Sequence, residues 1–129
     1  GAEGIEMGTR VIATEECVHA SERYKQNIIE ADETDTVIIK RAIGAPARAL
    51  KNQWTDKILE IEKQTPTYEA LKDYISGEAN KRYIYDEQEE DGFAWAGQVV
   101  GLIHDSPPVS VLFDRIIKEA ETMHQNLTK

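Results

Sequence analysis

The chain has 129 residues, of which 40% are apolar and 30% are charged, a size and composition that suit one globular domain or part of a larger one. Its formal net charge of −9 argues against nonspecific binding to nucleic acid or to an anionic membrane surface, because both need a positive field. No apolar run approaches the roughly 20 residues that cross a bilayer, so a membrane-spanning segment is also excluded at this level.

The first part of the chain is predicted to mix short strands with helical turns. Residues 4–13, GIEMGTRVIA, are typical of a short strand that ends in a Gly-Thr turn. Thr14 then favours a helical turn over the residues EECV. Apolar residues on one face predict a helix over 21–31, and a run of β-branched residues predicts a strand over 36–39.

The second part is predicted to be almost entirely helical. Pro46 suits the first position of a helix over GAPARALKNQW, and Thr55 suits the cap of a second helix over the residues that follow it. Thr67 caps a third, which Gly77 either breaks or continues through. The pattern over 109–123 predicts an amphipathic helix of about four turns. One or two short strands among these helices are too few to form a stable sheet alone.

The segment GFAWAGQVVGLI is unusually rich in small residues for a helix. In a helix, Gly97 and Gly101 share one face, so something is expected to approach that face closely. Another helix is the commoner occupant, and a flat ligand ring oriented by the Gln98 amide is the alternative.

Two further patterns indicate anion binding. Gly8 allows close approach of the backbone, and the N–H and hydroxyl of Thr9 can both donate to a phosphate, although a plain strand-ending turn is the commoner interpretation. The segment KRAIGAPARALK, residues 40–51, has four basic residues and no acidic one. It suits a nucleotide phosphate or an acidic partner, and a solvated basic face is the commoner interpretation.

No motif for hydrolysis, nucleotide hydrolysis or metal binding is present. The three histidines lie far apart, and none has metal-ligand spacing with another histidine or with Cys17. The single cysteine excludes an intrachain disulfide and favours a cytoplasmic location. There is no GxGxxG, Walker or Ser-His-Asp pattern.

Three segments, taken in order, resemble one family. GAEGIEMGTRVIATEEC, DTVIIKRAIGAPARALKN and FAWAGQVVGLI are similar to the C-terminal part of nitronate monooxygenases, formerly called 2-nitropropane dioxygenases. The family is FMN-dependent and includes flavin-type enoyl-acyl-carrier-protein reductases. The resemblance covers essentially all 129 residues. It implies an α/β fold, the C-terminal portion of a TIM (β/α)8 barrel flavoprotein, mostly helical within this chain.

The resemblance also implies a division of the chain. Residues 1–18 would be the last barrel strand and its phosphate loop, residues 19–105 a helix-rich inserted domain, and residues 106–129 the closing barrel helix. The rest of the barrel would lie outside this sequence. Without neighbouring strands, residues 1–12 are expected to be disordered or paired across a homodimer that also uses the closing helix.

By the same resemblance, the cofactor FMN would be bound by Gly8 and Thr9 at its phosphate and by Gly97 and Gln98 near its ring. Trp95 stands where the family's MAGQ segment has methionine. The family's catalytic histidine lies in a glycine-rich segment well upstream of the part that this chain resembles. No catalytic residue and no metal ligand is therefore assigned here.

The function implied is that of a segment of an FMN-dependent oxidoreductase, with oxidation of nitronates by oxygen as the leading reaction. Reduction of an enoyl thioester by NAD(P)H is the alternative, and the substrate is a small molecule in both cases. Alone, the segment is expected to be inactive and to bind FMN weakly or not at all. A noncatalytic, self-associating helical module is the competing interpretation.

Overall fold

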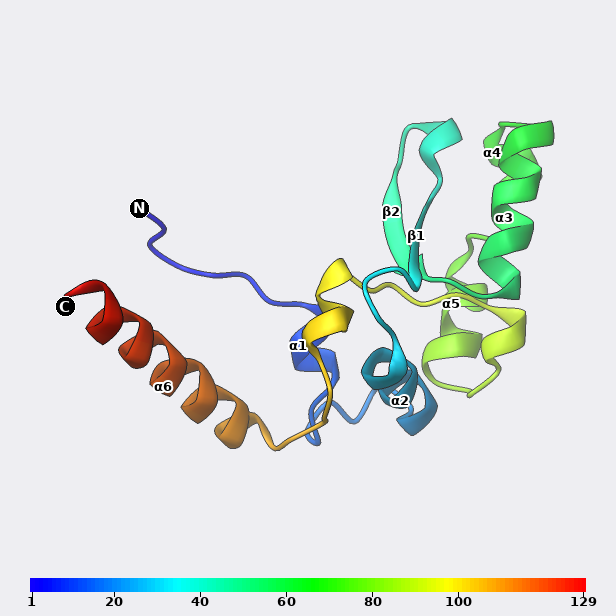
Figure 1. Ribbon diagram of the computed structural model, residues 1–129. Helices are drawn as coiled ribbons and strands as arrows, with labels where there is room; N and C mark the ends of the chain where they lie inside the picture. Colours follow the sequence, from blue (N-terminus) through cyan, green and yellow to red (C-terminus); the bar gives the residue numbers. More distant parts are fainter.

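The structure, a computed structural model, describes residues 1–129 and consists of a mixed helical body from which both chain ends extend (Figure 1). Residues 1–7 and the last helix leave the body on the same side (Figure 1). The elements in chain order are α1 (Thr9–Ile12), α2 (Glu22–Glu30), β1 (Thr36–Ile39), η1 (Arg41–Ile43), β2 (Ala47–Leu50), α3 (Gln53–Gln64), α4 (Tyr68–Leu71), α5 (Gly77–Ile84), η2 (Glu89–Asp91), η3 (Gln98–Leu102) and α6 (Val109–Leu127).

The strands β1 and β2 form an antiparallel hairpin, and an extended segment lies along the outer edge of β2. In that segment Ala94 accepts a hydrogen bond from the N–H of Leu50 at 3.0 Å, and the N–H of Ala96 donates to Arg48 at 3.2 Å. This second row of hydrogen bonds supports a hairpin that is only four residues long on each side.

The prediction of a helix beginning at Pro46 is wrong, because Ala47–Leu50 is strand β2. Gly44 has a φ of 72°, a left-handed conformation that glycine adopts without strain, and it helps to reverse the chain between the two strands. Hydrogen bonds to β1 on one side and to the 93–96 segment on the other satisfy the β2 backbone in an extended form. These tertiary contacts override the helix propensity of alanine.

Two predicted elements and one predicted helix cap are confirmed. The helix predicted over 21–31 is α2, and Ser21 caps it by accepting from the N–H of Tyr24. The strand predicted over 36–39 is β1. Thr67 caps α4, as expected.

Two helix starts differ from their predicted positions. Asn52, not Thr55, caps α3, and Thr55 is instead the third helical residue of a capping box with Asn52. Ser76 caps α5, which begins at Gly77, so the helical pattern after Thr67 is divided into two helices. The glycine breaks the pattern because a new cap precedes it.

The predicted strand over 4–13 and the predicted helical turn over EECV are both wrong. Residues 1–7 belong to no strand or helix, Thr9–Ile12 forms one helical turn, and residues 13–20 are irregular. A strand requires partners for its backbone N–H and C=O groups, and no neighbouring strand lies beside residues 4–8.

The small-residue segment is not one helix either. Residues 93–96 are extended along β2, Gly97 is extended, and only Gln98–Leu102 is helical, as the 3-10 turn η3. Glycine disfavours a helix in this segment, and hydrogen bonds to β2 satisfy its backbone in an extended form instead.

The core is divided into two clusters of buried apolar side chains. The first lies among α2, α5 and η3 and contains Ala13, Ala20, Tyr24, Ile28, Leu50, Tyr83, Ala94, Ala96, Val100 and Ile103. The second lies between the hairpin and α3–α5 and contains Ile39, Ala49, Ile58, Leu71, Ala79 and Phe93. Residues 93–96 contribute to both, so this segment joins the two halves of the body.

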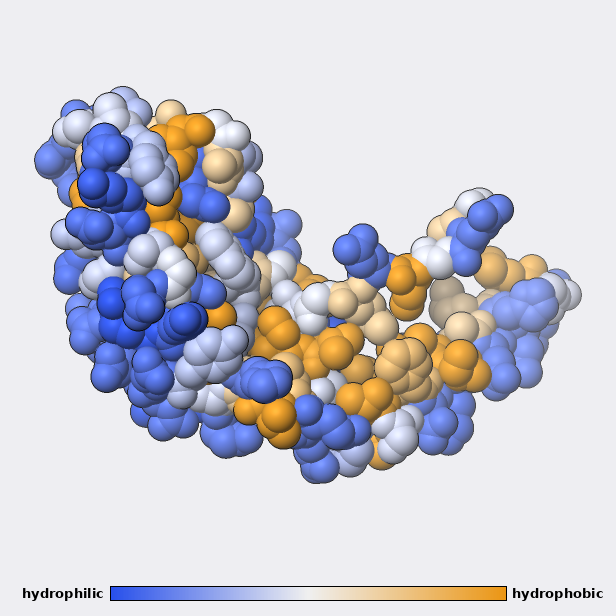
Figure 2. Space-filling model, turned by 180° about the vertical axis from the view of Figure 1, so that it is seen from behind, coloured by the Kyte–Doolittle hydropathy of each residue, from blue (hydrophilic) through white to orange (hydrophobic).

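Helix α6 is confirmed over the predicted range, yet its apolar stripe is largely uncovered. Only Leu112 is buried, while Phe113, Ile117 and Met123 are 48–60% exposed. In the space-filling view, apolar side chains gather on the concave side between the body and the two extended ends (Figure 2). None of the helices has the length and apolar character needed to cross a membrane.

Candidate functional site

The largest hollow of the molecule, about 790 Å³, lies where the N-terminal segment, η3 and the start of α6 meet. Fourteen residues line it: Glu6, Met7, Gly8, Thr9, Arg10, Gly97, Val99, Leu102, His104, Asp105, Leu112, Arg115, Ile116 and Glu119. Its wall therefore combines apolar side chains with both signs of charge.

Three of the four residues predicted to bind the cofactor lie at this hollow. The backbone N–H of Gly97 donates to the hydroxyl oxygen of Thr9 at 2.9 Å, which brings together segments that are 88 positions apart. Gly8 precedes this contact, at the start of α1. Gln98 is exposed and does not line the hollow, and the binding role of all four remains a prediction.

The corner formed by Gly8 and Thr9 fits an anionic group. A side chain at Gly8 would meet no atom within 4 Å, so the backbone stands open to an incoming ligand. The Thr9 hydroxyl accepts from Gly97, which leaves its own hydrogen free to donate. The first N–H groups of a helical turn have no partner within the turn. This donor set suits a phosphate.

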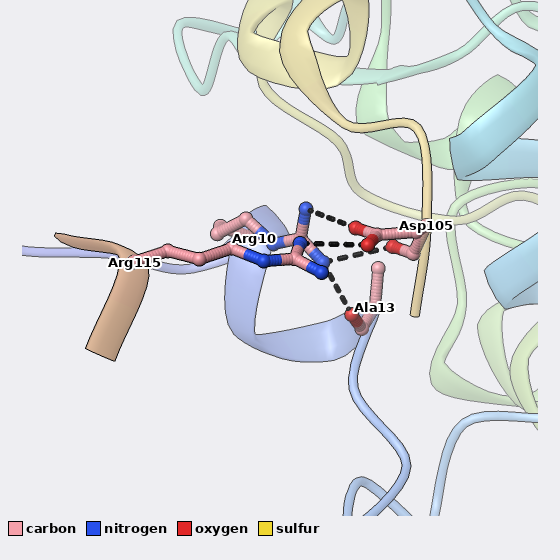
Figure 3. Close-up of polar contacts among 4 residues, drawn as sticks. All are labelled: Arg10, Ala13, Asp105 and Arg115. Carbon is pink, nitrogen blue, oxygen red and sulfur yellow. Dashed lines mark hydrogen bonds and ion pairs between the residues drawn. The ribbon is translucent and has the colours of Figure 1, made fainter. Parts of the chain in front are cut away.

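Arg10 follows this corner in sequence, and its guanidinium is bound at several points (Figure 3). Its Nη2 donates to the carbonyl oxygens of Ala13 at 2.7 Å and of Asp105 at 2.8 Å. Its Nη1 lies 3.5 Å from the Asp105 carboxylate, and Nε is buried without a hydrogen-bond partner. The side chain is only 15% exposed, so it is a fixed part of the site rather than a mobile surface group.

The Asp105 carboxylate binds a second arginine, from α6 (Figure 3). Arg115 Nη1 donates to Asp105 Oδ2 at 2.6 Å. The hydrogen bond from Arg115, together with the charges of Arg115 and Arg10, holds the pKa of the Asp105 carboxyl below its ordinary value, against a smaller effect of desolvation. Asp105 is thus a carboxylate shared by two cations at neutral pH.

Sequence reasoning did not identify Arg10, Asp105 or Arg115 as site residues. The ion pair between Arg10 and Asp105 spans 95 positions, and charged residues at such a distance carry no periodic signal. The only local signal was that Arg10 directly follows the Gly8-Thr9 pair.

The basic segment 40–51 does not reach the hollow, and its side chains are dispersed. Lys40 Nζ lies 4.9 Å from the centre of the Trp95 ring, and Arg48 donates to the hydroxyl of Thr36. Lys51 lies in a separate polar groove. The structure therefore brings no phosphate-binding cluster together here.

The close approach expected at the small-residue segment is confirmed at two of its glycines, Gly92 and Gly101. A side chain at Gly92 would lie 2.1 Å from the carbonyl oxygen of Ala79 in α5. A side chain at Gly101 would lie 3.1 Å from the backbone nitrogen of Glu33. The helix α5 therefore lies against Gly92 and a loop against Gly101, whereas Gly97 stays open toward the hollow, and the ligand ring there stays a prediction.

Comparisons with known proteins agree on one family. The family model described as "Nitronate monooxygenase" matches residues 1–119. A probable nitronate monooxygenase of Staphylococcus saprophyticus is 29% identical over 120 residues, covering 93% of this chain and 33% of that protein. A probable nitronate monooxygenase of Staphylococcus haemolyticus is 28% identical over 123 residues, covering 95% and 34%.

One solved structure is similar along nearly the whole chain. FabK from Thermotoga maritima superimposes with a TM-score of 0.90 at 32% identity, covering 98% of this chain and 40% of that one. The chain thus spans about one third of the length of the curated relatives that it matches. It corresponds to the C-terminal portion of a TIM-barrel flavoprotein fold.

Proposed function

Because this chain belongs to the nitronate monooxygenase family, a family of oxidoreductases, we propose that it supplies the C-terminal part of an FMN-dependent enzyme. The relatives are about three times as long, so the activity belongs to a larger barrel. Phosphate sites of such barrels commonly lie at the loops after the last two strands. The residues after position 8 would occupy that place.

The observation that carries this proposal is the hydrogen bond between Gly97 N–H and the Thr9 hydroxyl. It joins the two segments to which the family resemblance assigns FMN. Gly8 and Thr9 would donate to the phosphate, and Gly97 would allow the cofactor to approach closely, since a side chain there would meet no atom nearer than 3.6 Å. Gln98, which is exposed, would orient the ring by its amide.

We propose oxidation of nitronates by oxygen as the reaction, since the curated relatives are named for it. When bound, FMN takes electrons from the substrate and passes them on. The similarity to FabK keeps reduction of an enoyl thioester by NAD(P)H as the second candidate. A small-molecule substrate and a cytoplasmic location are part of both proposals.

The residues of this chain would position the cofactor rather than transfer protons. His104 is the one histidine at the hollow, and it does not lie in the glycine-rich setting of the family's catalytic histidine. We therefore assign no catalytic residue and expect the 129-residue chain to be inactive alone.

A noncatalytic role as a self-associating helical module is the third candidate. The observation that favours it is the exposed apolar stripe of α6. Uncovered apolar patches of this kind drive association in water.

FMN titration tests the proposed function. We expect saturable but weak quenching of flavin fluorescence by the purified chain, because only part of the phosphate site is present. Saturable binding that is left unchanged by Gly8→Asp would contradict the cofactor assignment. Binding by a chain unfolded in urea would show that the signal is nonspecific.

A further inference from the structure

The conformation of α1 depends on contacts made outside the helix. It is one turn of four residues, and its N-terminal residue Gly8 provides no side-chain cap. Its three hydrogen bonds, from Val11, Ile12 and Ala13 to Gly8 and Thr9, are 3.0–3.4 Å long. Nucleating a single helical turn is unfavourable, so such a turn persists only where tertiary contacts hold it.

Beside the packing of Ile12 against the first core cluster, two side chains of the turn form polar contacts with distant residues. The Thr9 hydroxyl is bound to the backbone of Gly97, and the Arg10 guanidinium is bound to Asp105. The guanidinium also donates to Ala13, the residue that ends the turn. Arg10 therefore joins the C-terminal end of α1 to the segment that leads into α6.

Asp105 binds the Arg10 guanidinium through both its backbone carbonyl oxygen and its side-chain carboxylate. Its carbonyl oxygen receives Arg10 Nη2 at 2.8 Å, and its carboxylate lies between Arg10 and Arg115. The bond from Arg115, at 2.6 Å, is a short charge-assisted hydrogen bond, whereas Arg10 Nη1 lies 3.5 Å from the carboxylate and is held there mainly by the attraction of opposite charges. The carboxylate thus connects α1 and α6, which form the two sides of the hollow.

We propose that Asp105 is a positioning residue, which holds Arg10 and thereby fixes the Gly8–Thr9 corner in the form that receives the phosphate of FMN. This inference rests on the proposed function. Asp105 does not contact the phosphate itself. Its effect is transmitted by the Arg10 side chain, which immediately follows the corner in sequence.

The test compares Asp105→Asn with Asp114→Asn. Asp105 lies just before α6 and Asp114 lies in its second turn, so both variants remove one negative charge from this part of the chain. Asp114 is exposed and forms no side-chain hydrogen bond or ion pair. Arg10→Lys is a second variant, which keeps the positive charge and removes the planar group that contacts Ala13 and Asp105 together.

Two readouts separate positioning from general stability. The first is hydrogen exchange of the amides of residues 9–13, measured by NMR beside the melting temperature. The second is the ratio of the affinities for FMN and riboflavin, which share the ring and differ by the phosphate. For Asp105→Asn and Arg10→Lys we expect about tenfold faster exchange and about tenfold lower preference for FMN. Asp114→Asn is expected to match the wild type in both.

The outcomes distinguish this inference from the proposed function. If the wild type prefers FMN and Asp105→Asn keeps that preference, the positioning role is overturned while the cofactor site stands. Equal weakening of FMN and riboflavin would likewise overturn it, since the effect would then be on the fold. If the wild type shows no preference for FMN, the phosphate site itself is refuted, and this inference with it.

Discussion

The side chain of Thr9 and the backbone of Gly97 are joined by one hydrogen bond of 2.9 Å, at the edge of a hollow to which both predicted cofactor segments contribute. The contact has a direct consequence for substitutions. Thr9→Val keeps the shape of the side chain and removes the acceptor, which leaves the half-buried N–H of Gly97 unpaired. We expect a loss of about 1–3 kcal/mol in the free energy of unfolding and weaker FMN binding. Thr9→Ser, which keeps the hydroxyl, serves as the control in urea unfolding.

The Gly8→Asp substitution tests the phosphate corner more directly. It places a negative charge where the phosphate is proposed to bind, without a steric clash in the free protein, because the space around Gly8 is open. FMN binding is expected to fall at least tenfold, whereas stability is expected to change little. Gly4→Asp, equally open and four residues upstream, is the matched control. Equal FMN affinity of the two variants would refute the assignment of Gly8.

The Gly92→Ala substitution tests the close approach of the chain at Gly92 to the helix α5. The new Cβ would lie 2.1 Å from the carbonyl oxygen of Ala79 and 3.2 Å from the nitrogen of Tyr83, both backbone atoms. Since helix backbone moves little, we expect a loss of about 3 kcal/mol or more in the free energy of unfolding. Gly77→Ala, where nothing lies within 4 Å, is expected to change it by less than about 1 kcal/mol. Guanidinium denaturation of both variants measures the difference.

Alkaline pH is expected to destabilise the fold through two buried tyrosines. Burial raises the pKa of Tyr83 to about 12, and burial also raises the pKa of Tyr24 above its ordinary value. Between pH 10 and 12 the folded state keeps a proton on Tyr83 that the unfolded state releases, so stability present below pH 10 is lost as pH rises. The expected loss is at most about 1 kcal/mol per pH unit for each tyrosine.

Urea midpoints from pH 8 to pH 11 check the contribution of Tyr83. Tyr83→Phe removes the titrating group and also the hydroxyl that accepts from Asn27. The variant is therefore expected to be less stable at pH 8 and to lose stability less steeply above pH 10. Tyr85→Phe, at an exposed position, is expected to keep the wild-type slope. Parallel curves for Tyr83→Phe and the wild type would contradict the assignment.

The exposed stripe of α6 is expected to make the isolated chain self-associate. Phe113 and Ile117 are 48% and 56% exposed and lie one helical turn apart. Replacing both by glutamate should shift the mass measured by light scattering toward the monomer. Gln125→Glu, which adds charge without removing apolar surface, should not. A wild-type chain that stays monomeric at high concentration would refute the expectation.

The structure confirms the sequence prediction where the signal is local and fails to confirm it where partners are distant. Ser21 and Thr67 cap their helices because a side-chain oxygen within three residues is sufficient. Strand β2 could not be predicted, since its extended form depends on β1 and on the 93–96 segment, and alanine alone favours helix.

The candidate site was predictable only in part for the same reason. The family resemblance indicated Gly8, Thr9 and Gly97, and the structure brings these three residues to one hollow. Gln98 faces outward there. The ion pair of Arg10 with Asp105 was not predicted, because opposite charges 95 positions apart have no spacing that marks them as partners.

The bond between Thr9 and Gly97 also has a consequence for how the chain folds. Closing a loop of 88 residues costs about 4 kcal/mol of chain entropy, far more than one hydrogen bond returns. We therefore expect the hairpin and helices between the two residues to form first, since they shorten the effective loop. During synthesis on the ribosome, Thr9 emerges long before Gly97 has been added. The corner proposed to receive the phosphate is thus expected to close only after the body between these two residues has folded.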